Sequence, residues 1–455
     1  MKKIILSFAS LCVALGMSAS PKYVFMFIGD GMGMGHVMAA ETYNRLSLGN
    51  EDNILMMQFP VASMALTYSA SSPVTDSAAA GTALATGRKT KNGMVGMTPD
   101  TTAVVSIATQ LKEQGYGVGI VTSVAYDDAT PASYYAHRPN RNMFVEINHD
   151  GARSGFDFIG GAYTHVAEKN IDACANVFDD YRANGYTVAH GLKGLKEIEG
   201  KEKVLLTGGN PHSPNDLGYT IDSLENVLTL RHLTAACLSH LLRVSPDRFF
   251  MMVEAGNIDH AAHGNDGAAV VKEVLNFQQS IRVAYDFYLQ HPEETLIIVT
   301  ADHDTGGMTV GVENGRTPTF DDIDYRHASK EKFNDYCLSH KDFTWEEMKQ
   351  AMSNELGLWS HIEMSEKEEA VVKEAFEAMK ANADGSQKTL YKEFNNFSAV
   401  VFDILNHKNG IGFTTFSHTG NPVPVFAIGE GCEEFSNVNN NIDIPAKIRD
   451  LVGLD

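Results

Sequence analysis

Residues 23–35 read YVFMFIGDGMGMG, a pattern typical of a strand in an α/β protein. An unbroken apolar run from Tyr23 to Ile28 ends abruptly in glycines around Asp30. Such runs form strands that are buried on both faces of a parallel sheet, and ligands lie beyond the carboxyl ends of these strands. The glycines lack the G-x-G-x-x-G spacing of a dinucleotide-binding loop. We therefore predict a buried strand that delivers Asp30 to a site, although a helix-capping aspartate would also fit the pattern.

The same arrangement, an apolar strand followed by acids or histidines, recurs along the chain. The predicted strands and the residues after them are Gly117–Thr122 with Asp128, Phe249–Val253 with Glu254, Asp259, His260 and His263, and Thr295–Thr300 with Asp302 and His303; His418 precedes a further strand at Pro424–Ile428. A helix predicted over Thr101–Gln114 gives the first of these strands the helix–strand order of a βαβ unit. We predict an α/β fold, a three-layer α/β/α sandwich around a mostly parallel central sheet.

Acids and imidazoles that meet at one edge of a sheet need cations, because unpaired buried carboxylates repel one another and desolvate at a high cost. Asp259 and His263 are four residues apart, so they share a face if their segment is helical. Aspartate and histidine are ordinary zinc ligands. The sequence therefore predicts divalent metal ions at the carboxyl edge of the sheet. A purely structural cluster of acids and histidines is the alternative.

A serine lies in the segment 74–83, between Asp76 and a run of small residues. Small residues after a polar start favour a helix, so we expect Ser77 at or near a helix N-terminus, where an anion is stabilised. A hydroxyl at that position could attack a phosphorus atom; the alternative is that Ser77 is an ordinary N-cap. Arg138 and Arg141 are candidates for an anion clamp, because a guanidinium can bond two phosphate oxygens at once.

Composition narrows the range of partners and of architectures. The chain has 455 residues and a formal net charge of −21, so it offers no basic stripe for nucleic acid and we expect no nucleic-acid binding.

We predict a single catalytic domain over 20–455. Within it, the segment of about 311–400 changes to acidic and lysine-rich helical patterns, which predicts a helical insertion or cap with charged faces toward solvent.

The first nineteen residues read as a signal peptide, with Lys2 and Lys3 before an apolar run and small residues before the cleavage site after Ala19. The run is too short to span a bilayer comfortably, so we expect an exported protein, periplasmic or secreted, with no transmembrane segment in the mature chain. Lipid attachment at Cys12 is the alternative, but Leu11 stands where a small residue is needed. The remaining cysteines, Cys174, Cys237, Cys337 and Cys432, leave two disulfides and buried free thiols as open possibilities.

Taken together and in this order, these clusters resemble the alkaline phosphatases. The resemblance is carried by Asp76-Ser77-Ala78, Asp128-Ala129-Thr130-Pro131, Arg141, Glu254, Asp259, His263, Asp302-His303 and His418-Thr419-Gly420. It extends from Tyr23 to about Ile428, and the segment 311–400 is longer than in the bacterial enzymes of that family. The resemblance implies hydrolysis of small phosphate monoesters, two zinc ions, one magnesium ion and, as the family is often dimeric, a homodimer.

The resemblance also implies a role for each residue of the site. One zinc would be held by Asp259, His263 and His418, and the second by Asp30, Asp302 and His303 together with the oxygen of Ser77; magnesium would take Asp30, Asp128, Thr130 and Glu254. Arg141 would hold the phosphate, with Asp76 helping to orient it. His260 stands where some bacterial members carry a lysine near the phosphate, which leaves the identity of the third metal open; alternatively His260 points into solvent.

The chemistry of the residues agrees with this resemblance. No histidine base adjoins Ser77, so we expect bound zinc to activate the hydroxyl and the reaction to pass through a phosphoserine. A sulfatase would need a modifiable cysteine at position 77, and a phosphodiester would occupy an oxygen that Arg141 contacts. A secreted metal-binding protein without catalysis is the remaining rival. We expect the enzyme to scavenge phosphate outside the cytoplasm.

Overall fold

A computed structural model of the chain describes residues 20–223, 225–311, 320–383 and 385–454. The predicted signal peptide and Cys12 lie outside the described residues. Within the described part of the chain, no helix combines the length and the apolar character that a membrane crossing requires.

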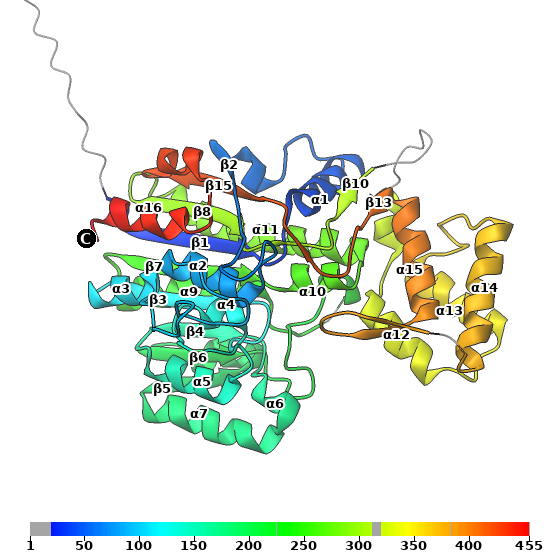
Figure 1. Cartoon of the computed structure of the whole chain (residues 1–455), viewed down its shortest axis with the longest axis horizontal. Helices are drawn as coiled ribbons and strands as arrows, with labels where there is room; N and C mark the ends of the chain where they lie inside the picture. The colour runs from blue at the N-terminus through cyan, green and yellow to red at the C-terminus, as the bar shows by residue number, and fades with distance from the viewer. Residues whose placement is uncertain (1–19, 224, 312–319, 384, 455) are drawn as a thin grey trace, which may run out of the picture.

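A nine-stranded sheet forms the centre of the molecule (Figure 1). Its strands are, in spatial order, β2 (Val61–Ala65), β15 (Val423–Gly429), β8 (Thr295–Ala301), β1 (Tyr23–Gly29), β7 (Phe249–Ala255), β3 (Gly117–Thr122), β4 (Phe158–Gly161), β6 (Lys203–Thr207) and β5 (Tyr186–His190). All neighbouring pairs are parallel except the two that involve β15. The predicted mostly parallel sheet is confirmed, and it also contains β2, β4, β5 and β6, which are not among the strands predicted above.

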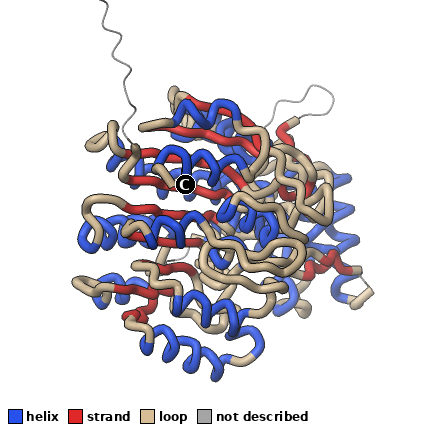
Figure 2. The backbone as a smooth tube through the Cα atoms, turned by 60° about the vertical axis from the view of Figure 1, so that its left-hand side comes forward, coloured by secondary structure: helices blue, strands red, loops and turns tan. Residues whose placement is uncertain are grey.

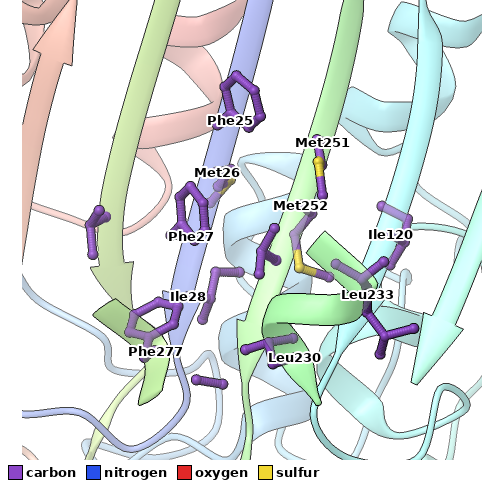
Figure 3. Close-up of a cluster of buried hydrophobic side chains, with 14 of the residues drawn as sticks. Phe25, Met26, Phe27, Ile28, Ile120, Leu230, Leu233, Met251, Met252 and Phe277 are labelled. Atoms are coloured by element: carbon purple, nitrogen blue, oxygen red, sulfur yellow. The ribbon is translucent and has the colours of Figure 1, made fainter. Parts of the chain in front are cut away.

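Helices cover both faces of the sheet, so the predicted α/β/α layering is confirmed; Figure 2 shows strands between layers of helix. On β1, Phe27 packs against Phe277 of α11 (ring centroids 5.9 Å apart), whereas its neighbour Met26 faces the opposite side and meets the hydroxyl of Tyr134. Every residue of β1 is buried, as expected for a central parallel strand. Figure 3 shows this apolar cluster. Its packing fixes the position of the sheet, and the polar residues of the site follow the ends of its strands.

The helices of the catalytic part are α1 (Met34–Leu46), α2 (Ser77–Thr86), α3 (Ile107–Glu113), α4 (Ala129–Ala132), α5 (Phe144–Arg153), α6 (Val166–Lys169), α7 (Cys174–Ala183), α8 (Gly191–Glu197), α9 (Leu230–Val244), α10 (Asn257–His263), α11 (Gly267–Tyr288) and α16 (Asp443–Val452). The helix predicted over 101–114 begins only at Ile107, because the Ser106 side chain accepts the backbone N–H of Thr109 and caps the helix there.

The segment predicted as an insertion builds a helical module beside the sheet, at the right of Figure 1. Its elements are α12 (Lys330–Ser339), α13 (Trp345–Leu356), α14 (Glu366–Lys380), the hairpin strands β11 (Ser386–Lys388) and β12 (Glu393–Asn395), and α15 (Asn396–Lys408). These helices bury an apolar core of their own, which includes Phe333, Phe376 and Phe402. The module therefore continues past position 400, to the end of α15. The domain boundaries that we gave from the sequence stay predictions.

The four cysteines that the structure describes are free thiols. Cys174, Cys237 and Cys337 are buried, and Cys432 is partly exposed. The sequence left either two disulfides or buried free thiols open, and the structure has free thiols.

Candidate active site

Strand register brings the acids of three separate segments to one edge of the sheet. Gly29, the last residue of β1, pairs with Ala255 of β7 on one side and with Ala301 of β8 on the other. Asp30 and Asp302 therefore leave adjacent strands at the same level, and the backbone N–H of Gly31 donates to Oδ1 of Asp302 at 3.0 Å. This convergence is what the sequence pattern predicted from the parallel strands.

Ser77 is the first residue of α2, as expected from its position before the small residues. The N-cap is Asp76, whose Oδ1 accepts the backbone N–H of Ala79 at 2.9 Å, so the alternative in which Ser77 itself caps the helix is wrong. Ser77 is 1% exposed, and its Oγ lies 3.1 Å from Nε2 of His303. No histidine stands beside Ser77 in the sequence, but the fold brings His303 next to it from the end of β8, where the resemblance expected it as a ligand of the same zinc.

Asp30, Asp302 and His303 form the first of two clusters of metal-ligand type, which we call the Asp30 cluster. Their ligand atoms lie within 4.8 Å of one another. Nε2 of His303 is 3.1 Å from Oδ2 of Asp302 and 3.4 Å from Oδ1 of Asp30. Among the described residues neither of these buried carboxylate oxygens has a hydrogen-bond partner. One ring nitrogen facing two carboxylate oxygens and a serine hydroxyl suits a bound cation better than it suits a single hydrogen bond.

The Asp259 cluster consists of Asp259, His263 and His418. Asp259 and His263 share a face of α10, as predicted, with 3.4 Å between Oδ2 and Nε2. His418 arrives on β14 (His418–Thr419), which pairs with β9 (Asp304–Thr305) directly after His303. The rings of His303 and His418 consequently stack with centroids 3.6 Å apart, which brings the two clusters into contact.

The tautomers of the two histidines show that the Asp259 cluster fits a metal. Nδ1 of His263 faces the carbonyl of Phe416 at 2.6 Å, and Nδ1 of His418 faces the carbonyl of Thr75 at 2.9 Å. A carbonyl can only accept, so each Nδ1 carries a proton and each neutral ring presents the lone pair of Nε2. These two Nε2 atoms lie 3.0 Å apart. Facing lone pairs repel unless a cation binds between them.

Electrostatics in the Asp259 cluster favour the same protonation states. Burial lowers the pKa of His263, and burial together with His303 lowers the pKa of His418 to about 4. Burial would raise the pKa of Asp259, but the surrounding histidines, His263 first, hold that pKa below its usual value. Two neutral imidazoles and one carboxylate are the ligand set expected for zinc.

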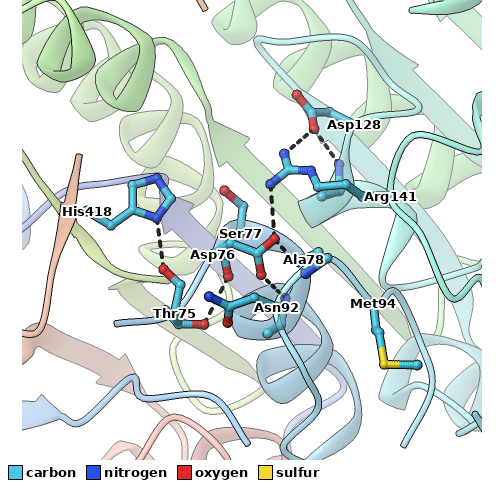
Figure 4. A network of polar contacts seen from close by, with 12 residues as sticks. Thr75, Asp76, Ser77, Ala78, Asn92, Met94, Asp128, Arg141 and His418 are labelled. Atoms are coloured by element: carbon cyan, nitrogen blue, oxygen red, sulfur yellow. Dashed lines mark hydrogen bonds and ion pairs between the residues drawn. The ribbon is translucent and has the colours of Figure 1, made fainter. Parts of the chain in front are cut away.

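Arg141 lies between two carboxylates at the mouth of the site (Figure 4). Its Nη2 donates to Oδ1 of Asp128 at 2.8 Å, and its Nη1 is 3.5 Å from Oδ2 of Asp76. The backbone N–H of Gly93 also donates to Asp76. Arg138, the other candidate from the sequence, turns away and pairs with Asp150. The structure thus brings only Arg141 to the serine segment.

The four residues expected to hold magnesium, Asp30, Asp128, Thr130 and Glu254, are all buried. Within the described ranges, acids and histidines whose ligand atoms all lie within 4.8 Å form the groups Asp30–Asp302–His303 and Asp259–His303–His418. Neither group contains Asp128 or Glu254, and the second has His303 where His263 was expected. Oε1 of Glu254 and the hydroxyl of Thr130 have no hydrogen-bond partner there. Burial, with Asp128 and Asp302, raises the pKa of Glu254 to about 8, and burial and Asp302 raise that of Asp30. Uncompensated oxygen donors of this kind fit a hard cation.

Three residues of the site escaped the sequence analysis: Thr122, His165 and Tyr391. The Thr122 hydroxyl donates to Glu254. Nε2 of His165 lies 3.3 Å from Oδ2 of Asp128, and although burial opposes it, the carboxylates of Asp128 and Glu168 raise the pKa of His165 to about 10. Its position at the end of a strand could have suggested Thr122, but His165 and Tyr391 stand in stretches without any motif.

His260 is 7% exposed, so the alternative in which it points into solvent is wrong. Its Nδ1 is 3.9 Å from Oδ2 of Asp216, and its ring packs against Tyr391 with centroids 4.0 Å apart. Burial opposes the charged form, but Asp216 raises the pKa of His260 overall. The residue therefore places a histidine with a raised pKa next to Asp259 in α10.

Comparison with known proteins agrees with this fold and site. The family model described as alkaline phosphatase matches residues 21–174 and 163–454. Alkaline phosphatase 4 of Bacillus subtilis (strain 168) is 28% identical over 435 residues, which cover 93% of this chain and 87% of that protein. The crystal structure of a cold-active alkaline phosphatase from the psychrophile Shewanella sp. has a TM-score of 0.80 and 26% identity, covering 94% of this chain and 99% of that one. The fold is also that of Thermus thermophilus alkaline phosphatase, with a TM-score of 0.79, 23% identity and coverages of 96% and 92%.

A buried serine at a helix N-terminus beside clusters of metal-ligand type defines a metal-dependent hydrolase. The chain belongs to the alkaline phosphatase family, and it is a phosphomonoesterase.

Proposed function

We propose that Ser77 is the nucleophile and that hydrolysis passes through a phosphoserine. The Ser77 oxygen would bond to phosphorus while the bond from phosphorus to the alcohol oxygen of the ester breaks, and the alcohol leaves with a proton. The oxygen of a water molecule would then replace Ser77 on phosphorus, which releases inorganic phosphate and restores the hydroxyl. The observation that carries this proposal is the 3.1 Å contact of the Ser77 hydroxyl with His303, at the first residue of a helix.

We assign the Asp259 cluster to one zinc ion, and the Asp30 cluster with Ser77 to a second. The facing Nε2 atoms of His263 and His418 support the first assignment, and the unpartnered oxygens of Asp30 and Asp302 support the second. Asp30, Asp128, Thr130 and Glu254 offer only oxygen donors, which suit magnesium. When bound, such cations act as Lewis acids that lower the pKa of an alcohol or a water and neutralise developing negative charge.

The remaining residues would bind and orient the phosphate. The N-terminus of α2 stabilises an anion beside Ser77. The guanidinium group of Arg141 would donate to two phosphate oxygens, both of which are free in a monoester. Asp76 would keep that guanidinium in place through its contact at 3.5 Å. Because Asp128 is held by Arg141 and His165, it would fix both the clamp and the magnesium side of the site. His260 would add positive charge near the phosphate.

For the wider biology, we propose export to the periplasm or the medium, where the enzyme would scavenge phosphate from small esters, and assembly as a homodimer. The charged and apolar pattern of residues 1–19 supports export. Sequencing the N-terminus of the mature protein checks the cleavage after Ala19, and sedimentation equilibrium checks the dimer. An intact Met1 or a monomer would contradict the respective statement.

Release of p-nitrophenol from p-nitrophenyl phosphate at alkaline pH tests the catalytic proposal. The panel comprises wild type, Ser77→Ala, wild type stripped with EDTA, and Ser436→Ala, an exposed serine, as the matched control. We expect loss of activity in the first variant and in the stripped sample, recovery with zinc and magnesium, and wild-type activity in the control. Full activity of Ser77→Ala would contradict the nucleophile. Full activity after verified metal removal would contradict the cation assignment, and zinc binding without any hydrolysis by wild type would favour a non-catalytic protein.

A further inference from the structure

The hairpin of the helical module reaches into the active site. Tyr391 stands in the turn between β11 and β12, and its hydroxyl donates to Oδ2 of Asp259 at 3.2 Å. Its ring centroid is 4.0 Å from that of His260 and 5.2 Å from that of His263. The module, expected from the sequence to be peripheral, thus supplies one aromatic side chain to the Asp259 cluster.

One strand of the hairpin is tied to the active site through Lys330, and the other strand is tied to α12 of the helical module. Nζ of Lys330 donates to the carbonyl of Gly264, at the end of α10, and to Oε1 of Gln387 in β11, both at 2.8 Å. In β12, the backbone N–H and the side-chain amide of Asn395 both donate to Oδ1 of Asn334 at 2.8 Å. Because α10 carries Asp259 and His263, the two bonds of Lys330 hold the Tyr391 hairpin beside that helix. A side chain held in this way can act as a preorganised wall.

Tyr391 and Ser77 lie at opposite ends of one row of contacts. Ser77 touches His303, the ring of His303 stacks on His418, and His418 meets His263, whose ring faces Tyr391. In phosphoryl transfer the attacking and leaving oxygens are in line, so the alcohol of the ester leaves on the side away from the serine. That side is the Asp259 cluster, where Tyr391 lies partly exposed.

Resting on the proposed roles of Ser77 and the Asp259 cluster, we propose that Tyr391 is a specificity-determining residue that contacts the alcohol portion of the substrate. Its ring, held between the metal cluster and solvent, packs against a planar or ring-containing alcohol. The enzyme therefore prefers monoesters of aromatic alcohols to monoesters of short aliphatic ones. Arg141 and the α2 N-terminus bind the phosphate common to both, so the preference comes from the hairpin alone.

Two pairs of compounds test this inference: benzyl and ethyl phosphate as substrates, and benzylphosphonate and ethylphosphonate as non-hydrolysable ligands. Both alcohols are primary, so the ratio of kcat/KM for the two esters reports recognition of the ring. We expect a ratio of about tenfold in wild type, as an aromatic contact provides. Tyr391→Ala brings the ratio close to one, Tyr391→Phe preserves it, and Leu390→Ala, a 59% exposed neighbour in the same turn, leaves it unchanged.

Calorimetric titration of the phosphonates gives the same comparison without turnover, with zinc content measured in each variant. Tyr391→Leu replaces the alanine variant if that variant fails to fold. An unchanged benzyl-to-ethyl ratio in Tyr391→Ala or Tyr391→Leu with wild-type zinc content overturns the inference, as does a wild-type ratio of one. Absence of hydrolysis of either ester by wild type would overturn the proposed function instead, and the phosphonate ratio would still decide the role of Tyr391.

Discussion

The hydroxyl of Ser77 and Nε2 of His303 lie 3.1 Å apart, although the serine begins α2 and the histidine follows β8. The same nitrogen faces Oδ2 of Asp302 at 3.1 Å and Oδ1 of Asp30 at 3.4 Å. His303 is therefore better placed as a ligand that shares a cation with the serine than as a base that accepts its proton. This relationship connects the nucleophile to both cation clusters, because the ring of His303 also stacks on His418.

Replacing His303 by alanine should remove zinc from the Asp30 cluster. Loss of a group that supports a metal ligand costs about 10- to 100-fold in metal affinity or activity, so loss of a ligand itself should cost more than about 100-fold. Zinc content by mass spectrometry and kcat/KM on p-nitrophenyl phosphate check this expectation. His361→Ala, an exposed histidine of the helical module, serves as the control. Normal zinc content with lost activity would instead indicate that His303 acts as a base.

Arg141 and Arg138 should differ sharply despite being three positions apart. Arg141→Ala removes the guanidinium group that lies between Asp76 and Asp128. We expect kcat/KM to fall about 10²-fold and inhibition by inorganic phosphate to weaken, because this group would bind the phosphate. Arg138→Lys keeps a charge near Asp150, away from Ser77, and should retain both properties. Equal effects of the two variants would contradict the assignment of the clamp to Arg141.

Glu273 makes the stability of the protein depend on pH. Burial raises its pKa from the ordinary 4.5 to about 7 while the Thr220 backbone N–H donates to it. Between these values the folded protein binds more protons at this site than the unfolded chain, so the free energy of unfolding falls as pH rises. We expect Glu273→Gln to flatten the fall of Tm over this range, relative to wild type and to the exposed control Glu377→Gln. Identical slopes in all three proteins would contradict the shifted pKa.

Lys330 should control how tightly the hairpin is held. Lys330→Met keeps an unbranched apolar side chain but removes the ammonium group, which donates to Gly264 and Gln387 and lies over the ring of Phe394. Hydrogen bonds from a charged group contribute about 1.5–3 kcal/mol, so trypsin should cleave the hairpin at Lys388 or Lys392 about tenfold faster or more. Lys367→Met, an exposed lysine of the same module, is the control. Cleavage at the wild-type rate would show that other contacts hold the hairpin.

The sequence was sufficient for the parts of the site that follow from strand register. Asp30 and Asp302 could be predicted to meet because both follow apolar parallel strands, and Asp259 and His263 because four residues separate them on a helix. The approach of His418 to His303 depends on a pairing of two residues in each strand, which is too short to leave a periodic pattern. That approach came only from the family resemblance.

Other features could not be predicted because they depend on long-range packing. The contact between Ser77 and His303 joins a helix to a distant strand end; nothing local marks either partner, and only the family resemblance placed them on one zinc. Tyr391 stands in a segment whose charged helices suggested a solvated cap, whereas these helices bury a core that holds the hairpin over α10. His165 reaches Asp128 from a loop after β4, where a single histidine has no local motif.

Acid quenching during steady turnover, followed by peptide mapping by mass spectrometry, tests the central claim most directly. The account predicts a phosphoryl group on the peptide that contains Ser77, located on that residue, in the metal-loaded protein and not in the EDTA-stripped protein or in Ser77→Ala. A metal-loaded protein that turns over substrate while every quenched sample carries an unmodified Ser77, or a phosphoryl group on another residue, would contradict it.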